Sequence, residues 1–285
     1  MEFLRSIEDQ FDVENAFPWM RKNFRFSIYA SIFYIISILL LQRYMNTHKR
    51  IDLRFSLSVW SFLLAIYSTV GAYYNICYLV PKIWNDGIKS AACDEIYIRN
   101  QTGLWLFLFI LSKVPELVDT YFIIFRKGPL IFLHWYHHAT VLIYCWFSYS
   151  QRAVVSILFS AVNYFVHAIM YMYYGLKARQ VNIPRQINVI ITSLQIVQMV
   201  FGLYMGGVMV MNQDELKPCG VSSILIFVTI GMYTSYFILF AIFFYDTYIA
   251  VKKKPVIIQK AHTNGVEIKP VLNNHQDLTE LQRHS

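Results

Sequence analysis

Four histidines lie inside long apolar stretches of the sequence. His134, His137 and His138 fall within five residues of one another, and His167 lies in the next apolar stretch. An ionisable side chain within a membrane-length apolar segment is costly, so each of these is a candidate functional residue. A neutral imidazole can attack a thioester, and neighbouring imidazoles can transfer protons or stabilise a developing enolate. The cluster therefore suits acyl transfer followed by formation of a carbon–carbon bond.

A second polar group lies in the apolar stretch before the histidine cluster. Lys113, Glu116 and Thr120 are spaced i, i+3 and i+7, which places them on one face of a helix, and Asp119 lies beside them. Two interpretations stay open. Either the group is a buried ion pair, in which Glu116 and Asp119 are structural, or Lys113 binds an anionic ligand.

Two further apolar stretches each carry a polar stripe at helical spacing. The first stripe consists of Asn163, His167, Tyr171 and Tyr174, and the second of Asn188, Thr192 and Gln195, with Gln198 nearby. Either stripe alone is also explained by hydrogen bonds between helices. Four polar-striped helices around a histidine cluster together predict a polar cavity inside a bundle.

The composition places these residues in a membrane protein. Of the 285 residues, 56% are hydrophobic and only 15% are charged, too few for the polar surface of a soluble domain. The hydrocarbon core of a bilayer, roughly 30 Å thick, requires about 20 helical residues per crossing. We predict an all-α integral membrane protein whose seven transmembrane helices lie at about 26–42, 57–80, 103–125, 131–149, 153–176, 187–211 and 221–250. Pro115 should kink the third helix, because it lacks a backbone N–H.

The charged residues in the connecting loops predict how the chain is oriented in the membrane and which partners its positive charge favours. The formal net charge is +8, but the basic residues sit in short loops beside apolar runs, which argues for membrane flanks and against nucleic acid. More of them lie on the side of the C-terminus, which predicts a cytosolic C-terminus and a lumenal N-terminus. The predicted organisation is a lumenal segment 1–25, a transmembrane domain 26–250 and a disordered cytosolic tail 251–285.

The second connecting loop carries features of a lumenal segment. Asn100 begins a glycosylation sequon, and Cys93 lies in the same loop. Cys219 follows the sixth predicted helix and therefore lies on the same side. An oxidising lumen would allow Cys93 and Cys219 to pair, and two unpaired thiols are the alternative.

Other classes of protein could also use intramembrane histidines. Membrane di-iron desaturases and hydroxylases need several histidine boxes, whereas here Glu116 and Asp119 are the main acidic residues that could supplement the four apolar-segment histidines. That is a poor ligand set for two irons. A seven-helix transporter or receptor could use the same histidines to carry or sense protons.

Four segments together resemble the signature stretches of the very-long-chain fatty acid elongases. They occur in the same order and at similar spacing as in that family, and the likeness covers all seven predicted helices. The segments are 113–120 (KVPELVDT), 134–138 (HWYHH), 167–174 (HAIMYMYY) and 192–198 (TSLQIVQ).

The resemblance implies a fold, a location and a reaction. The fold is a seven-helix, inverted-barrel-like bundle around an enclosed acyl-chain tunnel in the endoplasmic reticulum membrane. The reaction condenses a long-chain acyl-CoA with malonyl-CoA, releases CO2 and CoA, and requires no cofactor. The expected partners are the bilayer and the other enzymes of the elongation cycle, namely ketoacyl reductase, dehydratase and enoyl reductase.

The resemblance also implies roles for individual residues. His137 is expected to carry the acyl group, and His134, His138 and His167 to assist decarboxylation and condensation. By the resemblance, Arg126 is expected to contact the acyl-CoA, and Tyr245 or Tyr248 to close the site. Independently of the resemblance, the charges of Arg126 and Lys127 at the cytosolic mouth predict contacts with the phosphates of a nucleotide-containing thioester. The remaining expected acyl-CoA contacts are Lys113, Asn163, Tyr173, Thr192 and Gln195. Some relatives have a lysine where this chain has Asn188, so Arg185 is expected to supply that phosphate contact.

Overall fold

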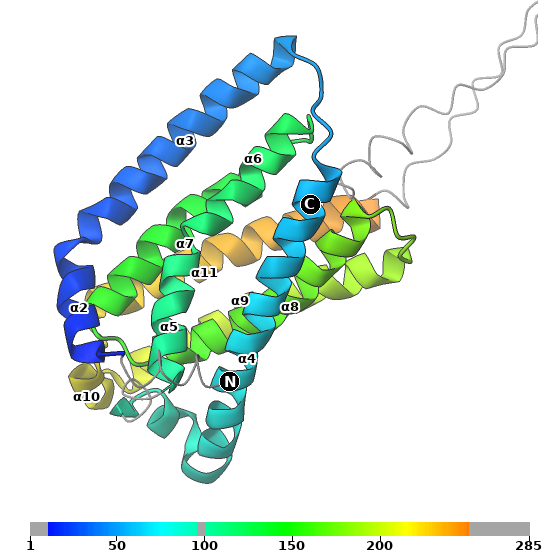
Figure 1. Cartoon of the computed structure of the whole chain (residues 1–285). Coiled ribbons are helices and arrows are strands. Elements are labelled where there is room, and N and C mark those ends of the chain that lie inside the picture. The colour runs from blue at the N-terminus through cyan, green and yellow to red at the C-terminus, as the bar shows by residue number, and fades with distance from the viewer. Residues whose placement is uncertain (1–10, 96–100, 251–285) are drawn as a thin grey trace, which may run out of the picture.

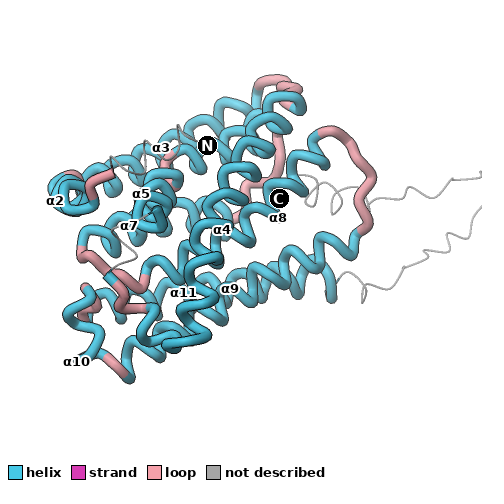
Figure 2. The backbone as a smooth tube through the Cα atoms, turned by 60° about the horizontal axis from the view of Figure 1, so that its bottom comes forward, coloured by secondary structure: helices cyan, strands magenta, loops and turns pink. Residues whose placement is uncertain are grey.

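The described part of the chain is helical and contains no strand. The computed structural model describes residues 11–95 and 101–250 (Figures 1 and 2). Four single helices in it are long and apolar enough to cross a bilayer: α3 (Phe24–Thr47), α4 (Arg54–Ala91), α8 (Ser156–Ala178) and α9 (Arg185–Met211). A fifth such segment joins α11 (Ser223–Phe244) to a π-helical turn (Tyr245–Ile249). The prediction of an all-α, multi-pass membrane protein is confirmed at this level.

The other two predicted crossings are shorter or more polar. The predicted helix 103–125 is divided into α5 (Gln101–Ser112), a 3-10 turn (Pro115–Leu117) and α6 (Val118–Phe125). The break falls at Pro115, as predicted, because proline removes one backbone hydrogen bond and clashes with the preceding turn. The histidine cluster begins in the first turn of α7 (Phe132–Ser150), and the polarity of its imidazoles lowers the hydropathy of this helix.

Helix α8 is the most deeply buried of the long helices, and α3 the least. Neighbouring helices pack closely around α8, so most of its surface contacts protein. At Gly71 of α4 a Cβ atom would lie 2.6 Å from the ring of Tyr164, so only glycine allows this approach. In contrast, α3 lies at the edge of the bundle (Figure 1) and exposes large apolar side chains such as Phe33 and Leu40. The polar stripe of α8 therefore faces protein, while most of α3 faces lipid.

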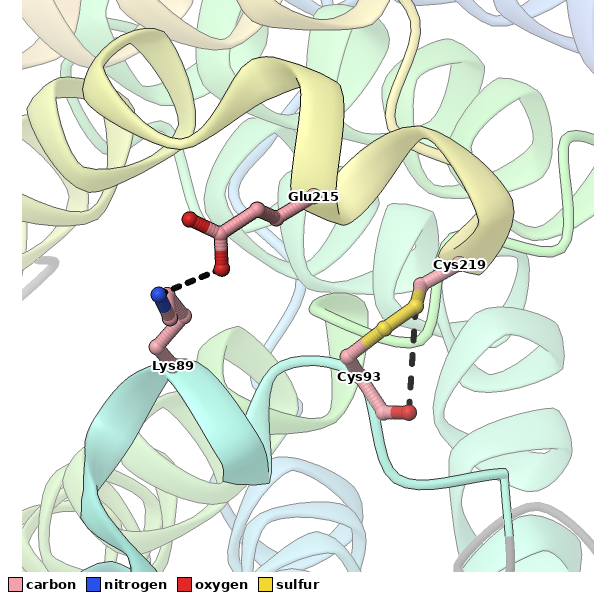
Figure 3. The surroundings of a disulfide bond; sticks show 4 residues. All are labelled: Lys89, Cys93, Glu215 and Cys219. Carbon is pink, nitrogen blue, oxygen red and sulfur yellow. Dashed lines mark hydrogen bonds and ion pairs between the residues drawn. A yellow bond between two sulfur atoms is a disulfide. The ribbon is translucent and has the colours of Figure 1, made fainter.

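One end of the bundle, here named the disulfide end, is closed by covalent and polar contacts. Cys93 and Cys219 form a disulfide, so the alternative of two unpaired thiols is wrong. An ion pair between Lys89 and Glu215 lies beside it (Figure 3). The same end carries α10 (Gln213–Leu216) and a 3-10 turn (Lys217–Cys219).

Helix α2 (Val13–Lys22) covers part of the disulfide end, although no helix was predicted within 1–25. The Asp12 side chain accepts a hydrogen bond from the Glu14 N–H and caps the helix. The Phe17 ring packs on Tyr149 at 4.5 Å, and the Arg152 guanidinium pairs with Glu14 at 3.1 Å. The mainly buried apolar face of this short helix thus explains its position against α7.

The opposite end, here named the mouth end, contains the loops 48–53, 126–131 and 179–184. Helix α4 enters there and continues well beyond its predicted end at residue 80. Pro81 lies inside the helix, which is interrupted only at Gly87, where φ is 83°. The basic residues Arg126, Lys177 and Arg185 lie at the mouth end.

Three predictions lie outside the described residues. They concern the first part of the N-terminal segment (1–10), the sequon at Asn100 (96–100) and the tail (251–285).

Candidate active site

A cavity of about 180 Å³ lies within the part of the bundle nearer the mouth end. It is lined by residues of α4, α6, α7, α8, α9, α11 and the π-helical turn, together with Arg126 and the loop that follows it. The predicted site residues that line it are Arg126, His134, His137, His138, Asn163, His167, Tyr173, Thr192, Gln195 and Tyr248, with Asp119. The polar cavity that the four stripes predicted is therefore present.

The imidazole rings of α7 are in contact with one another. The ring centroids of His134 and His138 are 4.5 Å apart, and those of His137 and His138 are 5.6 Å apart. His167 of α8 lines the same cavity, and its ring meets Tyr171 edge-on at 5.4 Å. Helical spacing alone brings the three imidazoles of α7 together, whereas the position of His167 depends on how α8 packs against α7.

His137 lies at the boundary between this cavity and a second, smaller one. The second pocket holds about 30 Å³ and extends from His137 toward the disulfide end, where Ser148 and Ser156 line it. Between these limits its walls are mainly apolar and aromatic, including Phe159 and Tyr233, whose rings stack at 5.3 Å. His137 and Asn163 line both spaces, so a ligand bound in one meets the same imidazole as a ligand bound in the other.

Lys113 forms a buried ion pair with Glu116. Its Nζ lies 2.8 Å from Glu116 Oε1 and donates a further hydrogen bond to Asn163 Oδ1 at 3.1 Å. Ser112 also donates to Glu116, at 2.8 Å, and His167 Nδ1 lies 3.9 Å from the second carboxylate oxygen. Lys113 is not among the residues that line the cavity. The geometry thus favours the ion-pair interpretation, and a direct contact between Lys113 and a ligand stays a prediction.

Asp119 is held by two neutral donors from different helices. Trp60 Nε1 of α4 donates to Oδ1 at 2.6 Å, and the Tyr171 hydroxyl of α8 donates to Oδ2 at 2.6 Å. A buried carboxylate needs such partners, because an unsatisfied charge in a low-dielectric interior is costly. The carboxylate joins α4, α6 and α8 at the cavity wall, in keeping with its predicted structural role.

Arg126 is the predicted cation that reaches the cavity. Its side chain is buried, and its Nε has no hydrogen-bond partner among the described residues. Burial lowers the pKa of the Arg126 guanidinium, and the neighbouring positive charges of Arg50 and Arg54 lower it further. A bound anion would relieve both effects. The site therefore has the electrostatics of an anion-binding position.

The other two predicted phosphate contacts lie outside the cavity wall. Lys127 has a left-handed backbone conformation, with φ of 57°, in the turn after α6. Arg185 donates to the Thr247 carbonyl at 3.1 Å, and its guanidinium lies 5.8 Å from the centre of the Tyr248 ring. Neither lines the cavity. Their predicted contacts with phosphate stay predictions.

Comparison with known proteins decides the family. The model of the ELO (GNS1/SUR4) family matches residues 19–256. This chain belongs to the ELO family. It is 44% identical to very long chain fatty acid elongase 6 of Drosophila melanogaster over 252 residues, covering 84% of this chain and 79% of that protein. It is 39% identical to the protein of that name in Mus musculus, covering 87% and 94%, and 41% identical to human very long chain fatty acid elongase 3, covering 83% and 88%.

The structure of this ELO-family chain also reveals neighbours of the site that the sequence did not indicate. Tyr236 of α11 packs against the His137 ring at 4.8 Å and hydrogen-bonds to Thr140 at 2.6 Å. Trp60 was indistinguishable from a lipid-interface aromatic until its bond to Asp119 was seen. Among the described residues, no three His, Cys, Asp or Glu side chains are grouped as the ligands of a metal ion would be.

Proposed function

We propose that this chain catalyses the condensing step of fatty acid elongation. In this reaction a long-chain acyl-CoA and malonyl-CoA yield a 3-oxoacyl-CoA two carbons longer, with release of CO2 and CoA. Membership of the ELO family and relatives named very long chain fatty acid elongases support the assignment. The observation that carries it is the position of His137 between a polar cavity and an apolar pocket.

The two spaces match the two parts of an acyl-CoA. The thioester lies at His137, the nucleotide end extends toward Arg126 at the mouth, and the acyl chain enters the apolar pocket. Gln195 donates a hydrogen bond to the Met170 sulfur at 3.3 Å, a weak acceptor that a ligand oxygen can replace. The Thr192 and Tyr248 hydroxyls, 3.2 Å apart, offer further polar contacts on the same wall.

His137 is the proposed nucleophile. Its neutral imidazole attacks the thioester carbonyl, the carbon–sulfur bond breaks, and CoA leaves as the thiol after taking up the imidazole proton. Malonyl-CoA then loses CO2, and the resulting enolate carbon attacks the acyl-imidazole carbonyl. The carbon–nitrogen bond to His137 breaks, and the imidazolate that leaves takes up a proton from water through the neighbouring imidazoles. His134, His138 and His167 transfer protons and stabilise the enolate. The position of all four imidazoles in the wall of one cavity supports this division of roles.

The proposed architecture includes seven crossings and an enclosed tunnel. Helices α5 and α6 together form the third crossing and α7 the fourth, in addition to the five long apolar segments. The tunnel consists of the polar cavity and the apolar pocket joined at His137. The proposed location is the endoplasmic reticulum membrane, with the disulfide end lumenal, Asn100 glycosylated and the C-terminal tail cytosolic. The other elongation-cycle enzymes are the proposed partners.

A condensation assay with purified protein tests the function. Wild-type protein should convert acyl-CoA and radiolabelled malonyl-CoA into labelled 3-oxoacyl-CoA, and His137→Ala should reduce the rate by about three orders of magnitude. His48→Ala is the matched control, because His48 lies at the mouth end and contacts Tyr44 rather than the other imidazoles. Full activity in His137→Ala would remove the nucleophile assignment. Inactive wild-type protein would contradict the function itself.

Mass spectrometry tests the covalent step separately. Incubation with acyl-CoA alone should release CoA and add the acyl mass to the peptide that contains His137. Condensation without CoA release in the first step would favour direct attack of the enolate on acyl-CoA. Near-stoichiometric iron in active, purified protein would instead support the di-iron alternative.

A further inference from the structure

A buried chain of hydrogen bonds connects the edge helix α3 to the histidine cluster. The Tyr34 hydroxyl lies 2.7 Å from Thr120 Oγ1, which lies 2.9 Å from His134 Nε2. We propose that Tyr34 is a positioning residue that acts through Thr120 to fix the orientation and the tautomer of His134. The inference rests on the proposed function, because it assigns the form in which His134 takes part in condensation.

The surroundings of Tyr34 differ from those of its neighbours on α3. Tyr34 is only 1% exposed, although the adjacent Phe33 is 71% exposed. With Ser27 and Ser31 it forms a buried polar stripe on a helix whose exposed surface is mainly apolar. Ser31 donates to the Ala139 carbonyl of α7 at 3.0 Å. Helix α3 thus presents its polar stripe to α6 and α7, the two helices that carry Thr120 and His134.

The chemistry of the three groups favours one direction for the chain. A phenol is a better hydrogen-bond donor and a poorer acceptor than an aliphatic alcohol, so Tyr34 donates to Thr120. The single hydroxyl hydrogen of Thr120 is then directed to His134, whose Nε2 accepts it. The imidazole proton consequently resides on Nδ1. In this tautomer, Nε2 is occupied and cannot act as a base.

This tautomer suits one of the roles proposed for the cluster. With its proton on Nδ1, neutral His134 offers a hydrogen-bond donor and can stabilise the oxygen of the malonyl-derived enolate. Its ring also contacts His138, so the orientation of His134 constrains the neighbouring imidazole. Loss of the Tyr34 hydroxyl leaves Thr120 free to rotate and the tautomer of His134 unspecified, while the remaining contacts of the cavity are unchanged.

The interface between α3 and α6 offers a closely matched control. Tyr121, next to Thr120, forms a hydrogen bond with Ser37 across the same pair of helices. Its ring also meets that of Tyr34 at 6.5 Å. Tyr121→Phe therefore removes one phenolic hydrogen bond from the same interface without touching the chain to His134. Any general loosening of α3 should appear in both variants.

The decisive experiment compares Tyr34→Phe, Thr120→Ser, Thr120→Val and Tyr121→Phe. In the condensation assay, Tyr34→Phe should lower kcat by about 10-fold with KM for both substrates within about twofold, in the range seen when the partner that orients a functional histidine is lost. Thr120→Val should show at least the same loss, while Thr120→Ser keeps a hydroxyl and should stay within about threefold of wild type. Tyr121→Phe should leave kcat within about twofold.

Two further measurements, the rate of a double variant and the 15N signal of His134, distinguish an effect on the orientation of His134 from a general loss of stability. The double variant Tyr34→Phe/Thr120→Val should be no slower than Thr120→Val alone, since both changes break one chain. In protein labelled with 15N-histidine, the His134 signal should report a proton on Nδ1 in wild type and a mixture of tautomers in Tyr34→Phe.

The outcomes that overturn the inference are distinct from failure of the proposed function. Equal kcat in Tyr34→Phe and Tyr121→Phe, independent losses in the double variant, or a wild-type proton on Nε2 would each contradict it. Wild-type protein that forms no 3-oxoacyl-CoA would contradict the proposed reaction instead, and the 15N signal would still test the hydrogen-bond chain.

Discussion

At the disulfide end of the bundle, the cations Lys89 and Arg152 each face a carboxylate. Lys89 pairs with Glu215 at 2.5 Å, and Arg152 pairs with Glu14 at 3.1 Å. At the mouth end, Arg126 is buried with its Nε unpaired among the described residues, and Arg185 contacts a carbonyl and a ring. Lys89 and Arg152 therefore stabilise the protein, whereas Arg126 is available for an anionic ligand.

The same contrast extends into the interior. The cavity nearer the mouth contains the histidines and amide side chains, while the pocket toward the disulfide end is mainly apolar and aromatic. Stability and ligand recognition are therefore separated along the bundle. Substitutions at the two ends should affect different measurements, and four predictions test that separation.

The largest effect on stability should come from the disulfide. Cys93 and Cys219 are 126 residues apart in the sequence, so their bond strongly restricts the unfolded chain. Cys93→Ser should lower the free energy of unfolding by about 2–4 kcal/mol, measured by thermal unfolding in detergent. Cys77→Ser, which removes a free and exposed thiol, is the control. A large increase in KM for acyl-CoA in Cys93→Ser would contradict the separation of the two ends.

The largest effect on substrate binding should come from Arg126. Arg126→Gln removes the buried guanidinium and should raise KM for acyl-CoA about 10-fold, equivalent to about 1.4 kcal/mol. The increase should shrink at high salt, since screening weakens the charge in the wild type. Arg152→Gln changes an arginine at the opposite end and should leave KM within about twofold. Equal changes in both variants would show that the mouth has no special role.

A glycine on α9 tests the apolar pocket. A Cβ atom at Gly202 would lie 2.2 Å from the ring of Tyr233, which lines that pocket, so Gly202→Ala must displace the ring. We expect a loss of about 1–3 kcal/mol in stability and a shift of product profiles toward shorter acyl chains. Gly207→Ala is the control, because nothing lies within 4 Å of its added Cβ. An unchanged profile with Gly202→Ala would remove Tyr233 from the proposed acyl pocket.

The smallest effect should come from the ion pair beside the disulfide. The side chains of Lys89 and Glu215 are 47% and 63% exposed, so solvent screens their attraction. Lys89→Gln should change the free energy of unfolding by less than about 1 kcal/mol and leave the condensation rate unchanged. A loss as large as that of Cys93→Ser would show that this pair, rather than the covalent bond, closes the disulfide end.

Local spacing explains how much of the site could be predicted from the sequence. His134 and His138 share a helix face at any packing, and Lys113 and Glu116 are close enough to pair within one helix. The break at Pro115 follows from the same local chemistry. Each of these features depends only on residues within about one or two turns, so the sequence contained sufficient information.

Features that depend on distant helices were beyond the sequence. Trp60 and Tyr171 meet Asp119 from α4 and α8. Spacing placed Tyr171 on a polar stripe but did not indicate its partner, and nothing in the sequence around Trp60 distinguishes it from the other five tryptophans. The preference for the ion-pair interpretation of Lys113 depends on its position outside the cavity lining, which the sequence alone could not give. Similarly, the prediction that α4 ends at residue 80 was wrong, because Pro81 lies inside the helix rather than at its end.

The length of α4 allows an experiment that shows on which side of the membrane the disulfide end lies. Residues 54–86, which precede the interruption at Gly87, extend about 50 Å at 1.5 Å per residue, well over the hydrocarbon thickness of about 30 Å. At ordinary tilts of about 20° the helix therefore extends beyond the hydrocarbon core. Trp84, 88% exposed, lies in the segment nearer the disulfide end. A cysteine introduced there in a Cys77→Ser background should react with an impermeant maleimide from one face of sealed vesicles only, and that face reports which compartment contains the disulfide.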